Sequence, residues 1–350
     1  MAKVVLGIGT SHSPMLSTPP EFWHVRGEGD KRREDLVDPE TGETVNYDEL
    51  LRRRNGNVCE VDREKFKEQW ADCQRGIAEL SKTLREVDPD AVIIVSDDQD
   101  EVLFDDNMPT FSVYWGDSAR LIPRMPAADA MEDIKASAWG YGDEEMDVPV
   151  DSALGQHLIE FLIENEFDVS HSRYMRPDYE YGGQIGPAGY VKKTRVTKPR
   201  RHGLGHGFSF VVRRLMDNKP FPLVPINQNT CYPPNTPTPR RCYKFGQAIR
   251  AAVEAWDSNK RVAVLASGGL SHFVCDETVD RMAIKGMMEK NGETLSSLPR
   301  ERLQSAASEI KNWITVSGAS EHLSPEVVEY VPVYRSPAGT GGGWGFMRWT

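Results

Sequence analysis

The sequence has no long hydrophobic run, no paired cysteines and no excess of basic side chains. None of its apolar stretches approaches the roughly 18–20 residues that a membrane-spanning helix needs. Its five cysteines are scattered, their number is odd, and no two form a CxxC pair. This usage argues against a disulfide framework and predicts reduced, mostly structural thiols. We therefore expect neither a membrane protein nor a small domain stapled by disulfides.

Acidic residues outnumber basic ones, and the formal net charge of −11 argues against nucleic acid or an anionic membrane as the main partner. The N-terminal segment MAKVVLGIG is too short and too interrupted by glycine for a signal peptide, and it predicts a first β-strand. Hydrophobic residues make up 39% and charged residues 27% of the chain, which is an ordinary globular composition. Together these features predict a cytoplasmic protein.

Signals for strands and helices alternate along the chain. Val4–Ile8, Ala91–Val95 and Val262–Ala266 are short apolar runs, typical of strands buried on both faces. After Asp62, a plausible helix N-cap, apolar residues recur at spacings of four and three up to Leu84, which predicts an amphipathic helix. The alternation predicts an α/β fold, with a mostly parallel central sheet flanked by helices in a single large domain.

Within this domain of residues 1–350, two stretches are rich in polar residues, proline and glycine. We expect residues of about 15–60 and 120–200 to form long loop insertions. Asn227–Pro239 is rich in proline and predicts an extended loop. Because α/β folds carry their sites at the carboxyl ends of the strands, the loops that follow the apolar runs are where we expect the chemistry.

Three histidines stand in loops of small residues at strand ends or helix starts. His12 follows the first strand, His206 precedes a predicted helix, and His272 follows the strand Val262–Ala266. A single histidine is more often structural, but three in equivalent topological positions predict a shared site at one edge of the sheet. Histidine and carboxylate ligands with open positions suit non-haem Fe(II), and spare histidines suit acid–base work.

Five motifs in this order are similar to those of the class III extradiol ring-cleaving dioxygenases. This family includes protocatechuate 4,5-dioxygenase catalytic subunits, gallate dioxygenases and 2,3-dihydroxyphenylpropionate dioxygenases. The opening Gly-Thr-Ser-His-Ser-Pro and the Asp-Asp-Gln of the second motif most resemble the 3-O-methylgallate dioxygenase branch. The resemblance runs from residue 4 to about 317, and the motifs are Ser11–Pro14, Asp98 to Phe111, Leu204–Phe208, Ser267–His272 and Glu309–Trp313.

The resemblance implies an Fe(II) ion held by His12, Glu309 and the residue at position 99, here Gln99. It implies that His206 and His272 are catalytic and that the reaction opens the ring of a catecholic aromatic acid with O₂. The substrate would be similar to 3-O-methylgallate, gallate or protocatechuate, and the setting would be the catabolism of aromatic or lignin-derived compounds. We expect a homo-oligomer whose own insertions cover the site.

A substrate carboxylate would need a cationic partner. Arg240 or Arg241, at the end of the proline-rich stretch, or one of the six Lys and Arg residues between Lys192 and Arg201 could provide it.

Two positions depart from the family pattern. Gln99 stands where the family has its second iron-binding histidine, and Gly205 replaces an aspartate beside His206. The amide oxygen of Gln99 could complete the metal site, or Asp98, Glu101 or His24 could supply the ligand instead. Two other readings stay open: a non-catalytic binding or scaffold relative with a degraded metal site, and a Zn-dependent hydrolase on the same fold.

Overall fold

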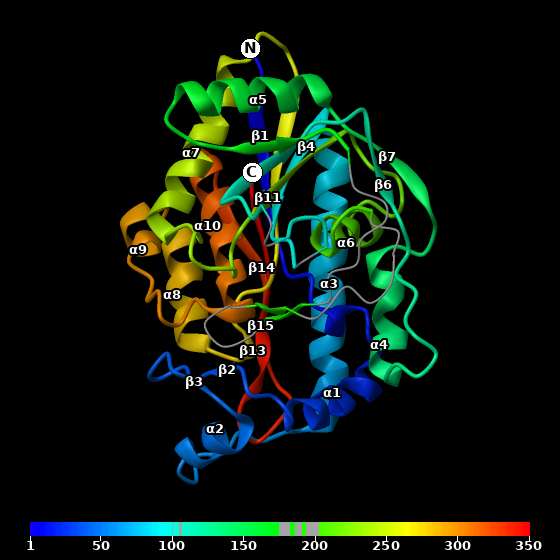
Figure 1. Cartoon of the computed structure of the whole chain (residues 1–350), viewed down its shortest axis with the longest axis vertical. Coiled ribbons are helices and arrows are strands. Elements are labelled where there is room, and N and C mark those ends of the chain that lie inside the picture. The colour runs from blue at the N-terminus through cyan, green and yellow to red at the C-terminus, as the bar shows by residue number, and fades with distance from the viewer. Residues whose placement is uncertain (100, 105–106, 175–182, 186–190, 194–202) are drawn as a thin grey trace.

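The computed structural model describes residues 1–99, 101–104, 107–174, 183–185, 191–193 and 203–350, with the backbone alone at 183–185 and 191–193. These residues form a nine-stranded sheet with helices on both of its faces (Figure 1), and three separate two-stranded sheets. The predicted α/β fold with a central sheet flanked by helices is confirmed.

The centre of the sheet is parallel, as the apolar runs predict. Here β1 (Lys3–Thr10), β12 (Arg261–Ser267), β4 (Ala91–Ser96) and β11 (Leu223–Gln228) lie side by side in the same direction. Antiparallel pairing of β5 with β11 and of β15 with β1 extends the sheet at its two sides. The outer strands are β5 (Phe111–Tyr114), β8 (Ser170–Ser172), β13 (His272–Val274), β14 (Pro325–Tyr334) and β15 (Thr340–Trp349).

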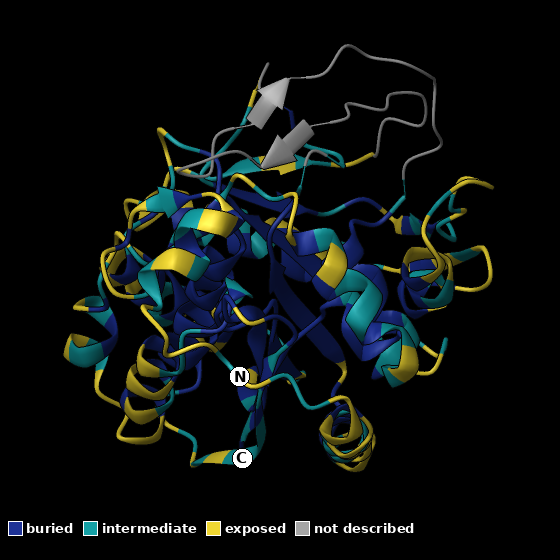
Figure 2. Cartoon of the chain, turned by 90° about the horizontal axis from the view of Figure 1, so that it is seen from below, coloured by how far each residue is buried: buried dark blue, intermediate teal, exposed yellow. Residues whose placement is uncertain are grey.

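The strand β4 shows why the central strands are apolar throughout. Side chains alternate between the two faces of a strand, so Ile93 and Val95 pack into one hydrophobic cluster while Val92 and Ile94 pack into the other. Figure 2 shows the result, a buried sheet between helices whose outer surfaces are exposed. A strand covered on both faces has no position for a polar residue until it ends, which places the chemistry at the strand ends.

Two layers of helices make these clusters. The helix α3 begins after its N-cap Asp62, whose side chain accepts the backbone N–H of Glu64, as predicted. On the same face as α3 (Arg63–Val87) lies α6 (His206–Arg214). The other layer consists of α5 (Ser152–Glu164), α7 (Pro239–Ala255), α8 (Glu277–Met288), α9 (Gly292–Ser296) and α10 (Ile310–Ala319), which follows the 3₁₀ turn η5 (Ser305–Glu309).

The first insertion is folded rather than a long irregular loop. Its side chains Leu36 and Leu50 form a small cluster with Val274 and Ala338 from the far end of the chain. A buried ion pair between Asp30 and Arg335, with atoms 2.6 Å apart, ties it to the sheet. It contains η1 (Pro14–Leu16), η2 (Pro20–Phe22), α1 (Trp23–Asp30), the hairpin β2 (Leu36–Val37) and β3 (Thr44–Val45), and α2 (Tyr47–Arg53).

The described part of the second insertion is also folded. It holds the hairpin β6 (Ser118–Leu121) and β7 (Met146–Pro149), with α4 (Glu132–Ser137) and η3 (Ala138–Tyr141) between them, and the helix α5. The short strands β9 (Gly183–Ile185) and β10 (Val191–Lys193) pair with each other. Residues 194–201 of the basic run lie outside the described residues, and for 192–193 only the backbone is described.

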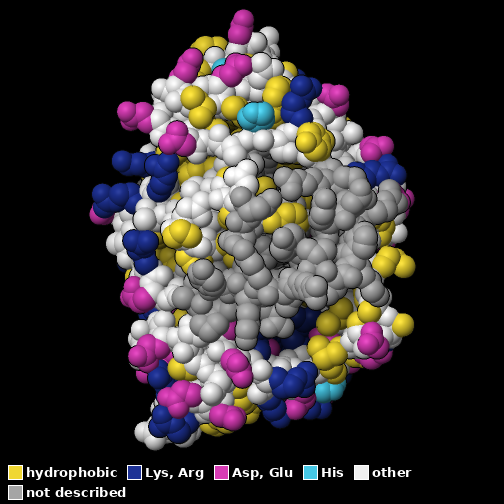
Figure 3. All heavy atoms as spheres, in the orientation of Figure 1, with side chains coloured by type: hydrophobic (Ala, Val, Ile, Leu, Met, Phe, Trp, Pro, Cys, Tyr) yellow, Lys and Arg dark blue, Asp and Glu magenta, His cyan; other side chains and the backbone are white. Residues whose placement is uncertain are grey.

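The distribution of charges on the surface and the state of the cysteines are as the composition predicts. Acidic and basic side chains are intermingled around the margin of the face shown in Figure 3. All five cysteines are free, and four of them are buried. In the part of the chain that is described, no helix combines the length and the apolarity needed to cross a bilayer.

Candidate metal centre

The register of the parallel strands brings the polar loops to one edge of the sheet. Thr10 of β1 pairs with Ser267 of β12, and Ser96 of β4 pairs with Asn227 of β11, so these strands end at the same level. His12 follows β1, residues 97–99 follow β4, and Gly268 follows β12. The prediction that the histidine loops meet at one edge therefore agrees with the fold.

Glu309 lies at the centre of the resulting cluster. Its Oε2 is 3.2 Å from Nε2 of His12, and its Oε1 is 3.4 Å from Nε2 of His272. Oε2 also accepts the backbone N–H of Gly269 at 2.5 Å. Burial alone would raise the pKa of this carboxyl, but the charges of His272 and His12 and their hydrogen bonds hold it well below its usual range. Glu309 is therefore a carboxylate held inside the protein.

The hydrogen bonds of His12 leave its Nε2 available to a metal. Its Nδ1 is 3.0 Å from Oγ of Ser267, and that hydroxyl donates its hydrogen to the carbonyl of Gly207 at 2.7 Å. Since the hydroxyl hydrogen is used there, Nδ1 of His12 carries a hydrogen, and Nε2 is the ring nitrogen that faces Glu309 and would bind a metal once it has released its proton. Fixing the tautomer in this way is how proteins orient a metal-binding imidazole.

Four buried side chains converge closely enough to share one metal ion. His12, Asp97, His206 and Glu309 each offer a ligand atom, and these atoms all lie within 4.8 Å of one another. Burial and the nearby charge of Glu309 raise the pKa of Asp97, because two buried carboxylates repel each other. A divalent cation would relieve that repulsion, and two imidazoles with two carboxylates suit Fe(II) or another first-row metal. The residues present therefore fit the metal that the resemblance implies.

Gln99 reaches this cluster, but through its amide nitrogen. That nitrogen donates to Oδ2 of Asp97 and to Oε1 of Glu309, at 3.2 Å each. The group of four that could hold a metal contains Asp97 and His206, and it does not include Asp98, Glu101 or His24. Asp97 is the residue that sequence reasoning missed, although it directly follows the last residue of β4.

The alternatives named for position 99 have other partners. Asp98 accepts the backbone N–H groups of Glu101, Val102 and Leu103 at 3.0–3.1 Å, which shapes its own loop. His24 lies on α1, in the folded first insertion.

Glu101 orients His206 where the family uses an aspartate. Its Oε2 accepts both the backbone N–H and the Nδ1–H of His206, at 2.7 and 2.8 Å, and its other oxygen pairs with Arg124. Burial opposes the charged imidazolium, but the Glu101 carboxylate raises the pKa of His206 to about 9. A Cβ atom at Gly205 would lie 3.0 Å from Oε2 of Glu101, so glycine leaves the room that this carboxylate needs.

Replacing Gly205 by the family's aspartate is expected to lower the free energy of unfolding by about 1–3 kcal/mol, because it brings a second carboxylate against Glu101. In a Glu101→Gln background the same change should cost less, since a glutamine amide can donate to the new carboxylate. Urea unfolding of the four proteins measures the difference. An equal cost in both backgrounds would show that Glu101 is not what the glycine accommodates.

His272 is positioned from both sides of its ring. Its Nδ1 donates to the carbonyl of Leu270 at 2.9 Å, and its Nε2 faces Glu309. Burial lowers the pKa of His272, but the Glu309 carboxylate outweighs it, so that this pKa is raised above its ordinary value. Nε2 is therefore the ring atom at which His272 can take up or release a proton towards the cluster.

The two arginines expected to bind a substrate carboxylate have partners elsewhere. Arg240 pairs with exposed Glu293 of α9 at 3.1 Å. The guanidinium of Arg241 lies over the ring of Phe167, 5.0 Å from its centroid. Both belong to the first turn of α7 rather than to an extended loop, because the Thr238 side chain caps that helix by accepting the N–H of Arg241. A role for them in binding a carboxylate stays a prediction.

A comparison with known protein families matches most of the chain. The family model described as the catalytic LigB subunit of aromatic ring-opening dioxygenase matches residues 57–329. That range contains Gln99, His206, His272 and Glu309, and His12 precedes it.

Two curated relatives carry related names. Gallate dioxygenase of Pseudomonas putida is 33% identical over 129 residues, which cover 36% of this chain and 30% of that protein. A 2,3-dihydroxyphenylpropionate/2,3-dihydroxicinnamic acid 1,2-dioxygenase of Dechloromonas aromatica is 25% identical over 199 residues, covering 56% of this chain and 48% of that protein. The matched stretches thus span less than half the length of either relative.

A solved structure, that of an uncharacterized protein from Escherichia coli K12, aligns with 79% of this chain and 91% of its own at 14% identity and a TM-score of 0.41. The family model, by contrast, spans well over half of the chain and includes four of the five positions expected to form the site. The chain therefore belongs to the family of LigB catalytic subunits of aromatic ring-opening dioxygenases.

Proposed function

We propose that this chain is a non-haem Fe(II)-dependent extradiol dioxygenase that uses O₂ to open the ring of a catecholic aromatic acid, similar to 3-O-methylgallate, gallate or protocatechuate. The observation that carries the proposal is the buried group of His12, Asp97, His206 and Glu309, with ligand atoms within 4.8 Å of one another. A relative that had lost its metal site would have no reason to keep two carboxylates and two imidazoles buried together.

The metal would be held by His12, Glu309 and the loop at positions 97–99. His12 offers Nε2, because its Nδ1–H is held by Ser267. Fe(II), when bound, supplies the electron-transfer chemistry that lets O₂ react with a catecholic ring. Asp97 is our proposed third ligand, and the Gln99 amide that bridges it to Glu309 orients the two carboxylates. A half turn of that amide would instead bring its oxygen towards the metal.

The two remaining histidines, His206 and His272, would act as acid–base groups. Nε2 of His272 is free of backbone partners and lies beside Glu309, so it is placed to exchange a proton with a hydroxyl of the substrate, accepting it when the imidazole is neutral. His206 keeps its proton near neutral pH because of Glu101, and it can donate a hydrogen bond to negative charge that develops on oxygen.

Replacing Asp97 by asparagine is expected to remove more bound iron than replacing Gln99 by alanine, because only the first change removes a charged ligand. We expect iron affinity to fall roughly 10- to 100-fold for Asp97→Asn and by less than about 10-fold for Gln99→Ala. Metal analysis after anaerobic Fe(II) loading measures both. The opposite ranking would make the Gln99 oxygen the third ligand.

Oxygen uptake tests the activity itself. Anaerobically purified protein loaded with Fe(II) should consume O₂ with at least one of 3-O-methylgallate, gallate and protocatechuate, and the same protein loaded with Zn(II) should not. No uptake with any of the three would contradict the dioxygenase proposal. Cytoplasmic location, homo-oligomerisation and the absence of nucleic-acid or membrane partners stay predictions from the sequence.

A further inference from the structure

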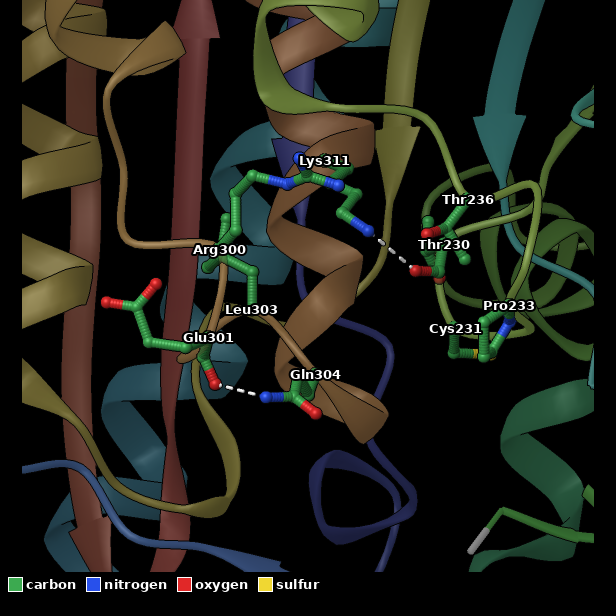
Figure 4. Close-up of a pocket in the computed structure, with 9 residues that line it drawn as sticks. All are labelled: Thr230, Cys231, Pro233, Thr236, Arg300, Glu301, Leu303, Gln304 and Lys311. Carbon is green, nitrogen blue, oxygen red and sulfur yellow. Dashed lines mark hydrogen bonds between the residues drawn. The ribbon is translucent and has the colours of Figure 1, made fainter. Parts of the chain in front are cut away.

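A pocket of about 380 Å³ lies between the loop that follows β11 and the segment that leads into α10 (Figure 4). This volume is in the range of small-molecule sites and can hold one aromatic ring with a substituent. The polar residues that line it are Thr230 and Thr236 on one side and Arg300, Glu301, Gln304 and Lys311 on the other.

Lys311 brings a buried amino group to this pocket, and burial lowers its pKa from the ordinary value of lysine. The residue is 6% exposed, and its Nζ donates to the backbone carbonyl of Thr230 at 2.8 Å. An ammonium group has three hydrogens to donate, so this bond leaves two of them. Within the described residues, no carboxylate lies at ion-pair distance from Lys311 or from Arg300, whose guanidinium Figure 4 shows on the same side of the pocket. Buried lysines are almost always paired, so an anionic group of a ligand is a partner that this amino group could take.

Thr230 adds a buried hydroxyl group next to Lys311. Its Oγ1 is enclosed by protein, the residue is 1% exposed, and its side chain interacts with the thiol of Cys231, which is only a weak hydrogen-bonding group. A carboxylate beside Lys311 and Thr230 would be a stronger acceptor for both side chains.

The pocket adjoins the proposed metal site. Lys311 is two residues after Glu309, which limits the distance between their Cα atoms to about 7 Å. The thiol of Cys231, which also lines the pocket, has a pKa raised first by burial and then by the charges of Asp97 and Glu309, whereas the charge of Lys311 acts to lower it. This thiol therefore lies within electrostatic range of both the metal-binding carboxylates and the lysine.

We propose that this pocket binds the carboxylate of the aromatic substrate, with Lys311 and Thr230 as the anchoring residues and Arg300 as a second cation. The identity of the ring rests on the proposed function, whereas the carboxylate site does not. The assignment favours aromatic carboxylic acids over simple catechols and gives the anchoring role to Lys311 in place of Arg240 and Arg241.

Binding to the metal-free full-length chain tests the pocket without turnover. In a ligand-observed NMR titration, 3,4-dimethoxybenzoate should bind at least about 10-fold more tightly than the neutral 3,4-dimethoxybenzamide. Lys311→Met, which keeps the length of the side chain, should remove this preference and weaken benzoate binding about 10- to 100-fold. Lys311→Arg should restore part of it, and Lys285→Met, at an exposed lysine of α8, should change nothing. Equal binding of the acid and the amide to the wild type would overturn the proposal.

Two further variants keep the test decisive if Lys311→Met does not fold. Arg300→Gln changes an exposed residue, and Thr230→Val keeps the side-chain shape, so each should weaken the preference for the acid several-fold. A preference that survives both changes would refute the pocket assignment.

Oxygen uptake separates the pocket from the proposed function. If the wild type consumes O₂ with gallate and pyrogallol alike, and Lys311→Met leaves their KM ratio unchanged, the pocket assignment fails and the activity stands. If no substrate supports uptake but the acid preference depends on Lys311, the activity fails and the pocket stands.

Discussion

Replacing Glu309 by glutamine is expected to reduce kcat/KM for oxygen-dependent ring opening by about 10³-fold or more and to strip most of the bound iron. Glutamine preserves the shape of the side chain and removes its charge. The effect is large because this one carboxylate contacts two of the three histidines of the site, His12 and His272, and also accepts the N–H of Gly269.

The hydrogen bonds around position 309 leave no good orientation for an amide. If the amide nitrogen takes the place of Oε2, it faces the N–H of Gly269, and two donors then oppose each other. If it takes the place of Oε1, it faces the amide nitrogen of Gln99, which is also a donor. The glutamine variant therefore loses the negative charge and sets two hydrogen-bond donors against each other in either orientation.

Iron content after anaerobic loading and oxygen uptake on the same sample measure this prediction. Glu289→Gln is a matched control, because Glu289 is an exposed glutamate whose only described ion pair is with Lys285. The control should keep its iron and its activity. A Glu309→Gln protein with full iron and full turnover would remove Glu309 from the metal site.

The core of the fold could be predicted because its strands are simple. Ala91–Val95 is apolar throughout, since both faces of β4 are covered by helices, and that pattern is visible in the sequence. The first insertion could not be predicted in the same way. Its elements are short, and Leu36 and Leu50 are buried only because Val274 and Ala338 come to them from the other end of the chain. Such long-range burial leaves no local periodicity.

Some residues of the candidate site could likewise be predicted from the sequence, and others could not. The three histidines were predicted from their places at strand ends or helix starts, whereas Glu309 was predicted only from the resemblance to the family. The choice among Asp97, Gln99 and Asp98 depends on which side chain the loop after β4 turns inward. Asp98 turns towards its own backbone, and this is set by hydrogen bonds that no spacing rule reveals.

The basic residues that could bind a substrate carboxylate were also hard to predict from the sequence. Arg240 and Arg241 were expected near the substrate because they follow a proline-rich loop. The cap at Thr238 starts α7 before them and directs them to the contacts with Glu293 and Phe167. Lys311 stands in the same motif as Glu309, and its burial beside Thr230 became visible only in three dimensions.

Replacing Glu101 by glutamine is expected to return the pKa of His206 from about 9 towards the ordinary value of histidine, since the carboxylate that offsets the effect of burial is lost. His206 would then be largely neutral at pH 8, and kcat should fall about 10²-fold there, with a smaller loss at pH 6. The pH–rate profile should therefore shift to lower pH. Glu132→Gln, at an exposed glutamate that pairs with Lys135, should leave the profile unchanged.

The ion pair between Glu101 and His206 should also make the stability of the metal-free protein depend on pH. Because the pKa of His206 is higher in the folded state than its ordinary value of 6.5, the folded chain holds an extra proton between those two values. The stabilisation is fully present below pH 6.5 and is lost as the pH rises through 9, so the free energy of unfolding should drop by about 3 kcal/mol across that interval. Urea unfolding at a series of pH values measures this drop. The drop should nearly vanish in Glu101→Gln, and a wild-type slope in that variant would mean that a different group titrates.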